Sequence, residues 1–160
     1  MKKYLLMLCC AAMCAGFVGC SDDDNEGGDV DVDVDVSVES LVGRWCVYQE
    51  EDWDEEENKM IMDDEFGEGV DLTIFEFNAD GTGGSFGGSY LSELEDENNW
   101  QRFTYTLKGT QVIMYDSDGY LDDFGVLKIT SSELVIAWYM EDGETGEKYI
   151  GAKSYYRRMK

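Results

Sequence analysis

From residue 41 to the C-terminus, short stretches of alternating apolar and polar residues follow one another, separated by turn signals. Pairs such as Asp80-Gly81 and Asp142-Gly143 mark the connections. Strands are predicted at 43–49, 72–78, 82–90, 100–107, 110–115, 120–130, 133–140 and 147–159. About eight strands in consecutive hairpins predict an all-β fold, a single up-and-down antiparallel β-barrel over residues 41–160.

The longest predicted connection, residues 50–69, is strongly acidic and contains one apolar island, Met60-Ile61-Met62. One interpretation is a lid over the mouth of the barrel. The other is an irregular loop held by a single anchoring contact, since loops commonly run over a surface in this way.

Residues 1–19 predict a secretory signal, because Lys2 and Lys3 precede an apolar run at 4–18 that ends in small residues. That run is shorter than the ~20 apolar residues a membrane-spanning helix needs. The sequence Val18-Gly19-Cys20 resembles the lipobox of bacterial lipoproteins, which implies cleavage before Cys20 and lipidation of its thiol. Several acyl chains on one residue give stable anchoring. An ordinary signal with an incidental cysteine is the alternative.

Four residues directly after that cysteine, Ser21, Asp22, Asp23 and Asp24, resemble an export tag. In one phylum of Gram-negative bacteria this tag sends lipoproteins to the outer face of the outer membrane. The resemblance implies a lipid-anchored protein of the outer membrane that is exposed on the cell surface. The alternative is a solvated linker that faces the periplasm.

Residues 20–40 are predicted as an acidic, flexible tether between anchor and barrel. Alternating Asp and Val at 29–36 favour an extended chain, because the like charges repel one another. Calcium binding by this tract and an added edge strand are the other two interpretations.

The formal net charge is −24. The signal holds only Lys2 and Lys3 as charged side chains, so removing their two positive charges leaves −26 on the mature chain. Such a field repels nucleic acids and favours cationic partners. The sequence contains no histidine, which excludes histidine-based catalytic triads, general bases and metal sites. Only Cys46 remains as a thiol beyond the signal and anchor, so no intrachain disulfide is expected.

The first predicted strand contains Gly43-Arg44-Trp45, which resembles the G-x-W signature of lipocalins. Lipocalins also place an arginine near the end of the last strand, across the tryptophan, and Arg157 and Arg158 occupy that position here. The stretch 77–82 resembles the turn after the second strand in small bacterial lipocalin-like lipoproteins. The resemblance implies that Gly43, Trp45 and one of the two arginines close the barrel floor. Only one arginine can do so, because neighbouring strand residues face opposite ways.

Five aromatic residues on the predicted strands either line a ligand pocket or simply fill the barrel: Phe75, Phe77, Phe103, Tyr105 and Trp138. A barrel of about eight strands leaves room for one small ligand at most. Cys46 is expected to face away from the interior if Trp45 faces inward. Asp116, Asp118 and Gly119 resemble part of a calcium loop, but a plain turn explains them better, because the later ligands are missing.

Two functions follow from these observations. The first is a non-catalytic, membrane-anchored lipocalin-like protein that binds a small apolar molecule in its barrel. The alternative is an interaction module with a filled barrel, which contacts a protein or glycan through its acidic surface and loops. Neither requires a metal, a cofactor or nucleic acid, and an enzyme is not expected because the commonest nucleophiles and bases are absent.

Overall fold

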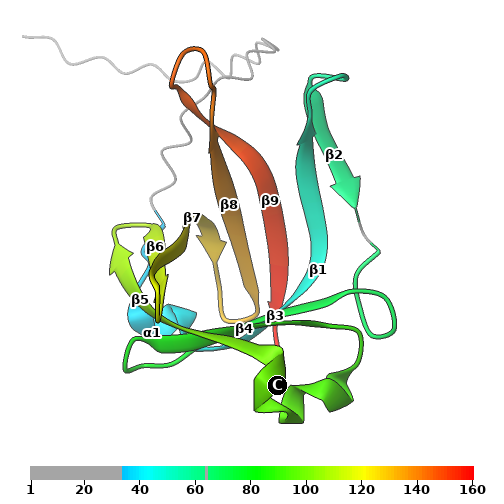
Figure 1. Ribbon diagram of the computed structural model, residues 1–160, viewed down its shortest axis with the longest axis vertical. Coiled ribbons are helices and arrows are strands. Elements are labelled where there is room, and N and C mark those ends of the chain that lie inside the picture. The colour runs from blue at the N-terminus through cyan, green and yellow to red at the C-terminus, as the bar shows by residue number, and fades with distance from the viewer. Residues whose placement is uncertain (1–33, 64) are drawn as a thin grey trace, which may run out of the picture. The chain divides into compact units, whose positions relative to one another are not determined.

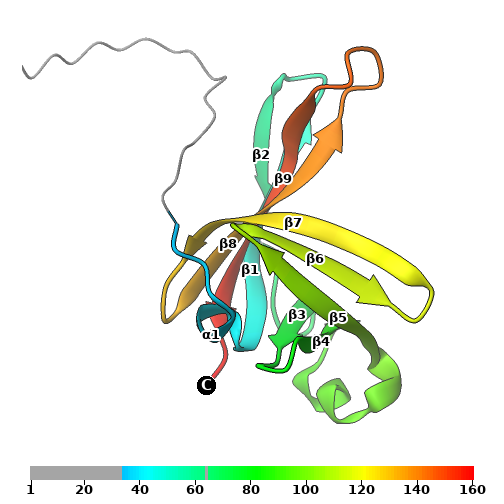
Figure 2. The same cartoon turned by 90° about the vertical axis from the view of Figure 1, so that its left-hand side faces the viewer.

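The computed structural model describes residues 34–63 and 65–160, so the predicted signal, Cys20 and the acidic tag lie outside the described residues. The chain forms one antiparallel sheet of nine strands, eight of which close into an up-and-down barrel, as predicted (Figures 1 and 2). The strands are β1 (Gly43–Asp54), β2 (Lys59–Asp63), β3 (Leu72–Phe77), β4 (Thr82–Gly88), β5 (Trp100–Lys108), β6 (Gln111–Asp116), β7 (Gly119–Ile129), β8 (Glu133–Glu141) and β9 (Lys148–Arg158).

The barrel closes where the first strand pairs with the last. β1 pairs with β3 through Gly43–Cys46 and with β9 from Trp45 to Asp52. The register between β1 and β9 shifts between Val47 and Gln49, which marks a bulge at Tyr48. The other strands pair in chain order, β3 to β9, as consecutive hairpins must.

The acidic stretch after residue 49 differs from both interpretations offered for it. β1 continues to Asp54, and the apolar island lies in β2, where Met60, Ile61 and Met62 pair with Trp53, Asp52 and Glu51. The island is therefore one arm of a hairpin, and the predictions of a lid and of an irregular loop are both wrong. The sequence did not predict β2 or the end of β1, because their many charged residues break the apolar alternation. An edge hairpin in water needs no apolar face.

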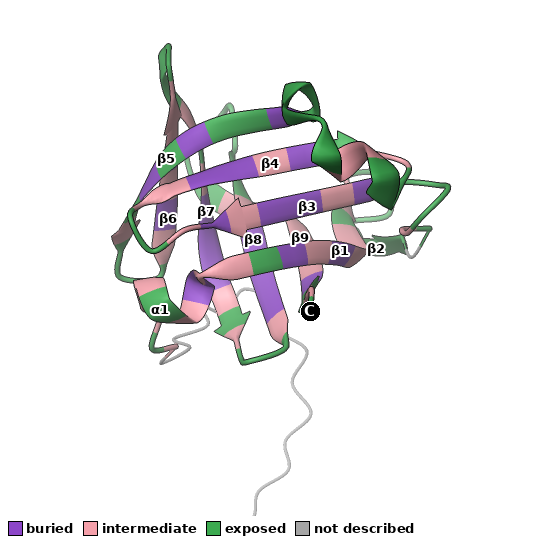
Figure 3. Ribbon diagram, turned by 90° about the horizontal axis from the view of Figure 1, so that it is seen from below, coloured by how far each residue is buried: buried purple, intermediate pink, exposed green. Residues whose placement is uncertain are grey.

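Alternating side chains divide the barrel into an inner core and an outer wall. Inward residues of seven barrel strands form the main core, which includes Trp45, Phe77, Phe124, Ile136 and Tyr156, all at most 1% exposed. A smaller cluster of Leu72, Ile74, Phe86 and Trp100 lies on the opposite face of β3, β4 and β5. Figure 3 shows the resulting alternation of buried and more exposed residues along β3 and β5.

Three short helices complete the described part of the chain. α1 (Val38–Leu41) is capped by Ser37, whose hydroxyl accepts the Ser40 N–H, and it buries Leu41 completely. η1 (Leu91–Glu95) and η2 (Glu97–Asn99) connect β4 to β5, and Leu94 packs on the outer cluster. Packing against the main core starts at Val34, inside the segment predicted as the tether. Every helix in residues 34–63 and 65–160 is too short or too polar to cross a bilayer.

Candidate functional site

The floor of the barrel is built around Trp45, which has no exposed surface. Trp45 and Arg158 are direct partners in the β1–β9 register, so both side chains are on the same face. The Cζ atom of Arg158 lies 4.1 Å from the centroid of the Trp45 ring. The Trp45 indole N–H donates to the carbonyl of Leu41 at 2.7 Å, which ties α1 to the same floor.

Arg158 also binds three backbone carbonyls. Its guanidinium donates to Ser40 at 2.7 Å, to Ser131 at 2.9 Å and to Val42. Gly43 lies under the same group: its φ is +131°, and a Cβ there would lie 2.6 Å from Arg158 Nη1. The position therefore requires glycine both for its backbone and for the space that the arginine occupies.

The neighbouring Arg157 points to the outer face and stacks over Tyr48, 4.1 Å from Cζ to the ring centroid. The Tyr48 hydroxyl donates to Glu133 at 3.0 Å, and Lys128 pairs with Glu133 at 2.5 Å. These contacts, chiefly the one with Lys128, hold the pKa of Glu133 below its usual value. The structure thus places Arg158, and not Arg157, across Trp45.

Residues predicted to line or fill the barrel pack against one another. The ring centroids of Phe75 and Phe77 lie 5.8 Å apart, those of Phe77 and Tyr105 5.2 Å, and those of Phe124 and Trp138 5.4 Å. Phe103 and Phe75 form a further pair at 6.3 Å. These are ordinary distances for aromatic pairs in a packed core. Of the two open interpretations, this packing favours the filled barrel.

Toward the other end of the barrel, a short polar chain runs across the inner face of β8, β9 and β1. The Trp138 indole N–H donates to Ser154 Oγ at 3.0 Å, and the Ser154 hydroxyl donates to Glu50 Oε1 at 2.8 Å. Ser154 is only 1% exposed. Burial is the main cause that raises the pKa of Glu50, and nearby Asp52, Asp71 and Asp63 raise it further. Burial likewise raises the pKa of Tyr156.

Sequence reasoning missed Glu50 and Ser154. The predicted connection 50–69 places Glu50 in a loop, and nothing in the sequence distinguishes it from the many other carboxylates of the chain. Ser154 belongs to no sequence motif that would mark it as a site residue. A correct extension of the first strand to residue 54 would have placed Glu50 on the same face as Asp52, at a spacing of two.

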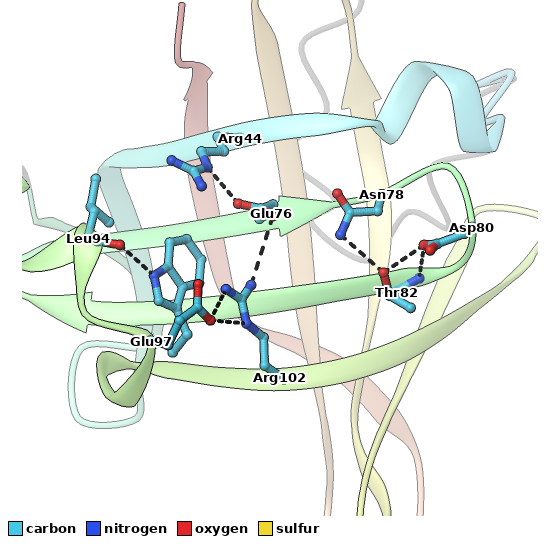
Figure 4. A network of polar contacts seen from close by, with 9 residues as sticks. Arg44, Glu76, Asn78, Asp80, Thr82, Leu94, Glu97 and Arg102 are labelled. Carbon is cyan, nitrogen blue, oxygen red and sulfur yellow. Dashed lines mark hydrogen bonds and ion pairs between the residues drawn. The ribbon is translucent and has the colours of Figure 1, made fainter.

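On the outer wall, Arg44 and Arg102, both labelled in Figure 4, lie over the ring of Trp100. Cζ lies 5.4 Å from the ring centroid for Arg44 and 4.7 Å for Arg102. Glu76, between them, pairs with Arg44 at 2.6 Å and Arg102 at 3.9 Å. Arg102 also pairs with Glu97 at 2.6 Å, and Trp100 donates to the Leu94 carbonyl at 3.0 Å.

Beside this network a hollow of about 590 Å³ opens on the outer wall. Glu76, Asn78 and Thr82 contribute to it from β3, β4 and their connecting turn, and Arg102, Thr104 and Tyr115 from β5 and β6. We call it the wall groove. A hollow of about 430 Å³ at Tyr48, Ser132, Glu133, Arg157 and Arg158 is a second one.

Two further predicted features have defined positions. Asp116 Oδ1 accepts the backbone N–H groups of Asp118 at 2.8 Å and Gly119 at 3.2 Å, the geometry of an aspartate-stabilised turn. Cys46 faces the outer cluster, away from the core, as predicted. Its partial burial raises the pKa of the thiol.

The family comparison agrees with this geometry. Residues 41–136 match the model of a lipocalin-like domain, from the end of α1 to the first part of β8. No curated protein matches the sequence. The matched region contains Gly43 and Trp45, and the closed eight-stranded barrel has the architecture expected of such a domain. The chain therefore belongs to the family of lipocalin-like domains.

Proposed function

We propose that this protein is a lipid-anchored, non-catalytic interaction module of the outer membrane surface, whose filled barrel is a rigid scaffold. The observation that carries this proposal is the packing of Phe75, Phe77, Phe124 and Trp138 against one another inside the barrel. A lipocalin-like barrel is an architecture that supports ligand binding. A small apolar ligand, however, would need the space that these rings occupy.

The surface offered to a partner is the four-stranded ribbon formed by β2, β1, β9 and β8. Its two hairpins extend in the same direction beyond the rest of the barrel (Figures 1 and 2). Four apolar side chains on it are 39–60% exposed: Ile61, Met62, Tyr139 and Met140. Because neighbouring strand residues face opposite ways, each face of the ribbon carries one exposed apolar side chain from each hairpin.

Acidic residues border those side chains along both hairpins. The β1–β2 hairpin carries Asp54, Glu55, Glu56, Glu57 and Asp63, and the β8–β9 hairpin carries Glu141, Asp142, Glu144 and Glu147. Among the basic side chains on the ribbon, Lys59 pairs with Glu57 and Lys153 with Glu51. A partner with basic and apolar residues complements this surface, because opposite charge speeds association and burial of the apolar residues adds affinity.

The absence of catalysis is part of the proposal. Lipocalin-like domains are generally non-enzymatic. The carboxylate with the clearest burial effect, Glu50, is bonded to Ser154 on the inner face, and no histidine is present to act with it.

The partner surface is tested with two cationic peptides, one of alternating Lys and Leu and one of Lys alone. The Lys-Leu peptide should bind the mature protein more tightly and slow hydrogen exchange at 59–63 and 138–141. Met62→Ser with Tyr139→Ser should weaken that binding about tenfold or more. Tyr120→Ser, at a tyrosine 62% exposed outside the ribbon, is the control. Protection elsewhere, or an apolar molecule recovered inside the barrel by native mass spectrometry, would refute the proposal.

Anchoring and export are tested separately. Mass spectrometry of the mature N-terminus should find Cys20 as the first residue, carrying acyl chains. Replacing Asp22, Asp23 and Asp24 by alanine should remove the protein from the reach of protease on intact cells. An unmodified Cys20 refutes the anchor, and unchanged surface exposure of the alanine variant refutes the tag.

A further inference from the structure

The wall groove has the size and chemistry of a binding site that is separate from the ribbon. At about 590 Å³ it falls within the range of small-molecule sites, roughly 300–1,000 Å³. Its lining combines the Asn78 amide, the hydroxyls of two threonines and Ser117, the pair of Glu76 and Arg102, the Asp116 carboxylate, Gly83, and the rings of Phe103 and Tyr115. A site with a few fixed polar groups and an aromatic surface selects a ligand by its hydrogen bonds and shape.

The charges of Glu76 and Arg102 in the groove are paired. Glu76 pairs with Arg44 and Arg102, and Arg102 also pairs with Glu97 (Figure 4). Asp116 also lines the groove, and its Oδ1 accepts the backbone N–H groups of Asp118 and Gly119. A carboxylate at this edge repels anions and accepts hydrogen bonds from hydroxyl groups. The field of the acidic chain repels anions in addition. A neutral ligand with several hydroxyl groups suits this lining.

The hydrogen-bonding groups are held in place before any ligand arrives. Asn78 Nδ2 donates to Thr82 Oγ1 at 3.1 Å, and the Thr82 hydroxyl donates to Asp80 Oδ1 at 2.6 Å. From inside the barrel, the Tyr105 hydroxyl donates to the backbone carbonyl of Asn78 at 2.8 Å. A side-chain amide offers two donors and two acceptor sites, so one bond to Thr82 leaves Asn78 able both to donate and to accept. Fixed groups lose little conformational entropy on binding.

An aromatic pair stands at the edge of the groove. Tyr115 lines the groove and meets Tyr120 edge-on, with 6.4 Å between the ring centroids and 81° between the planes. The Tyr120 hydroxyl donates to Asp123, which fixes the second ring. The face of an aromatic ring carries partial negative charge and attracts the polarised C–H groups of a sugar ring.

We propose that the wall groove binds a neutral saccharide. Sugar hydroxyls donate and accept hydrogen bonds equally well, which suits Asn78, Thr82 and Thr104. The C–H face of a sugar ring suits Tyr115. This site is independent of the ribbon and of the partner proposed for it.

The test is a titration of the mature protein with defined trisaccharides: maltotriose, cellotriose and chitotriose as neutral probes, sialyllactose as the anionic probe and a chitosan trimer as the cationic probe. At least one neutral probe should bind and shift the amide resonances of 78–82 and 102–104 in NMR spectra. Sialyllactose should not bind. Tyr115→Leu and Asn78→Ala should each weaken binding about tenfold, the value of one well-placed interaction.

Thr106→Val is the control. Thr106 is an exposed threonine of β5, the strand that also contains the groove residue Thr104, but Thr106 does not line the groove. It should bind within about twofold of the wild type, as should Met62→Ser with Tyr139→Ser, which tests the ribbon. Circular dichroism spectra of the variants should match the wild-type spectrum, as a check that each variant is folded. Binding by none of the neutral probes, stronger binding of a charged probe, or equal binding by Tyr115→Leu and Asn78→Ala would overturn the proposal.

Discussion

The guanidinium of Arg158 lies over the indole of Trp45, with 4.1 Å between Cζ and the ring centroid. One residue belongs to the first strand of the barrel and the other to the last, and they are partners across the closing seam. The same guanidinium binds the carbonyls of Ser40, Val42 and Ser131. The contact therefore joins α1, the start of β1, the β7–β8 turn and the end of β9.

Arg158→Ala should lower the free energy of unfolding by about 2–4 kcal/mol, because it removes a cation–π contact and leaves carbonyl groups without their charged donor. Urea denaturation measures the loss. The matched control is Arg157→Ala, which removes a similar stacking contact on the more exposed Tyr48 and should cost less than about 1 kcal/mol. Equal costs for the two variants would contradict a special role of Arg158.

Gly43→Ala should cost about 1–3 kcal/mol, since alanine at a φ of +131° is strained and its Cβ meets Arg158. The two positions should be coupled. In the double variant with Arg158→Ala the steric clash is absent and only backbone strain remains, so the two costs should not add. Additive costs in a double-mutant cycle would show that Gly43 is required for its backbone alone.

Trp45→Ala should cost about 3–5 kcal/mol, the usual result of removing a fully buried large aromatic side chain. It also removes the bond to the Leu41 carbonyl that fastens α1. Trp53→Ala, on the partly exposed part of β1, is the control and should cost far less. Thermal or urea unfolding of the two variants measures the difference, and similar losses would contradict the buried floor.

Glu50 and Glu133 should respond to pH in opposite directions. Burial raises the pKa of Glu50 above its ordinary value of 4.5, so its favourable contribution is complete below that value and is lost as the pH rises through the raised pKa. Glu50→Gln keeps the acceptor for Ser154 and should therefore be more stable than the wild type at pH 7. This gain in stability should disappear as the pH falls below 4.5, the ordinary pKa of the carboxyl group.

The pKa of Glu133 is lowered, chiefly by its bond to Lys128, so its contribution is present above the ordinary value of 4.5 and is lost as the pH falls through the lowered pKa. Glu133→Gln should be less stable than the wild type at pH 7, with the difference closing in acid. Urea unfolding from pH 3 to pH 7 measures both variants. The same sign for the two would refute the assignment of their environments.

Strand order and turn positions could be predicted because they depend on local patterns. Apolar alternation marks β3 and β5, and Asp80-Gly81 marks the turn before β4. The hairpin of β1 and β2 could not be predicted, because its many acidic residues leave no alternation of apolar and polar residues. Its strands form because β9 and β1 provide edges to pair with, which is a long-range effect.

The wall groove could not be predicted from the sequence for a related reason. Arg44, Glu76 and Arg102 lie on three different strands and meet only because the register aligns them across Gly84. Gly84 leaves the space that Arg102 fills, since a Cβ there would lie 2.7 Å from Arg102 Nη1. Register across strands is set by packing of the inner face, and the sequence of the outer face does not encode it.

The sequence by itself determined the all-β meander, the inward position of Trp45 and the presence of an arginine at the end of the last strand, because period-two alternation and turn chemistry are local. Only the tertiary structure decided that Arg158 and not Arg157 covers Trp45, since the bulge at Tyr48 and the β1–β9 register select the face of each. It also decides how the aromatic residues pack inside the barrel, because that packing depends on how all eight strands close around them.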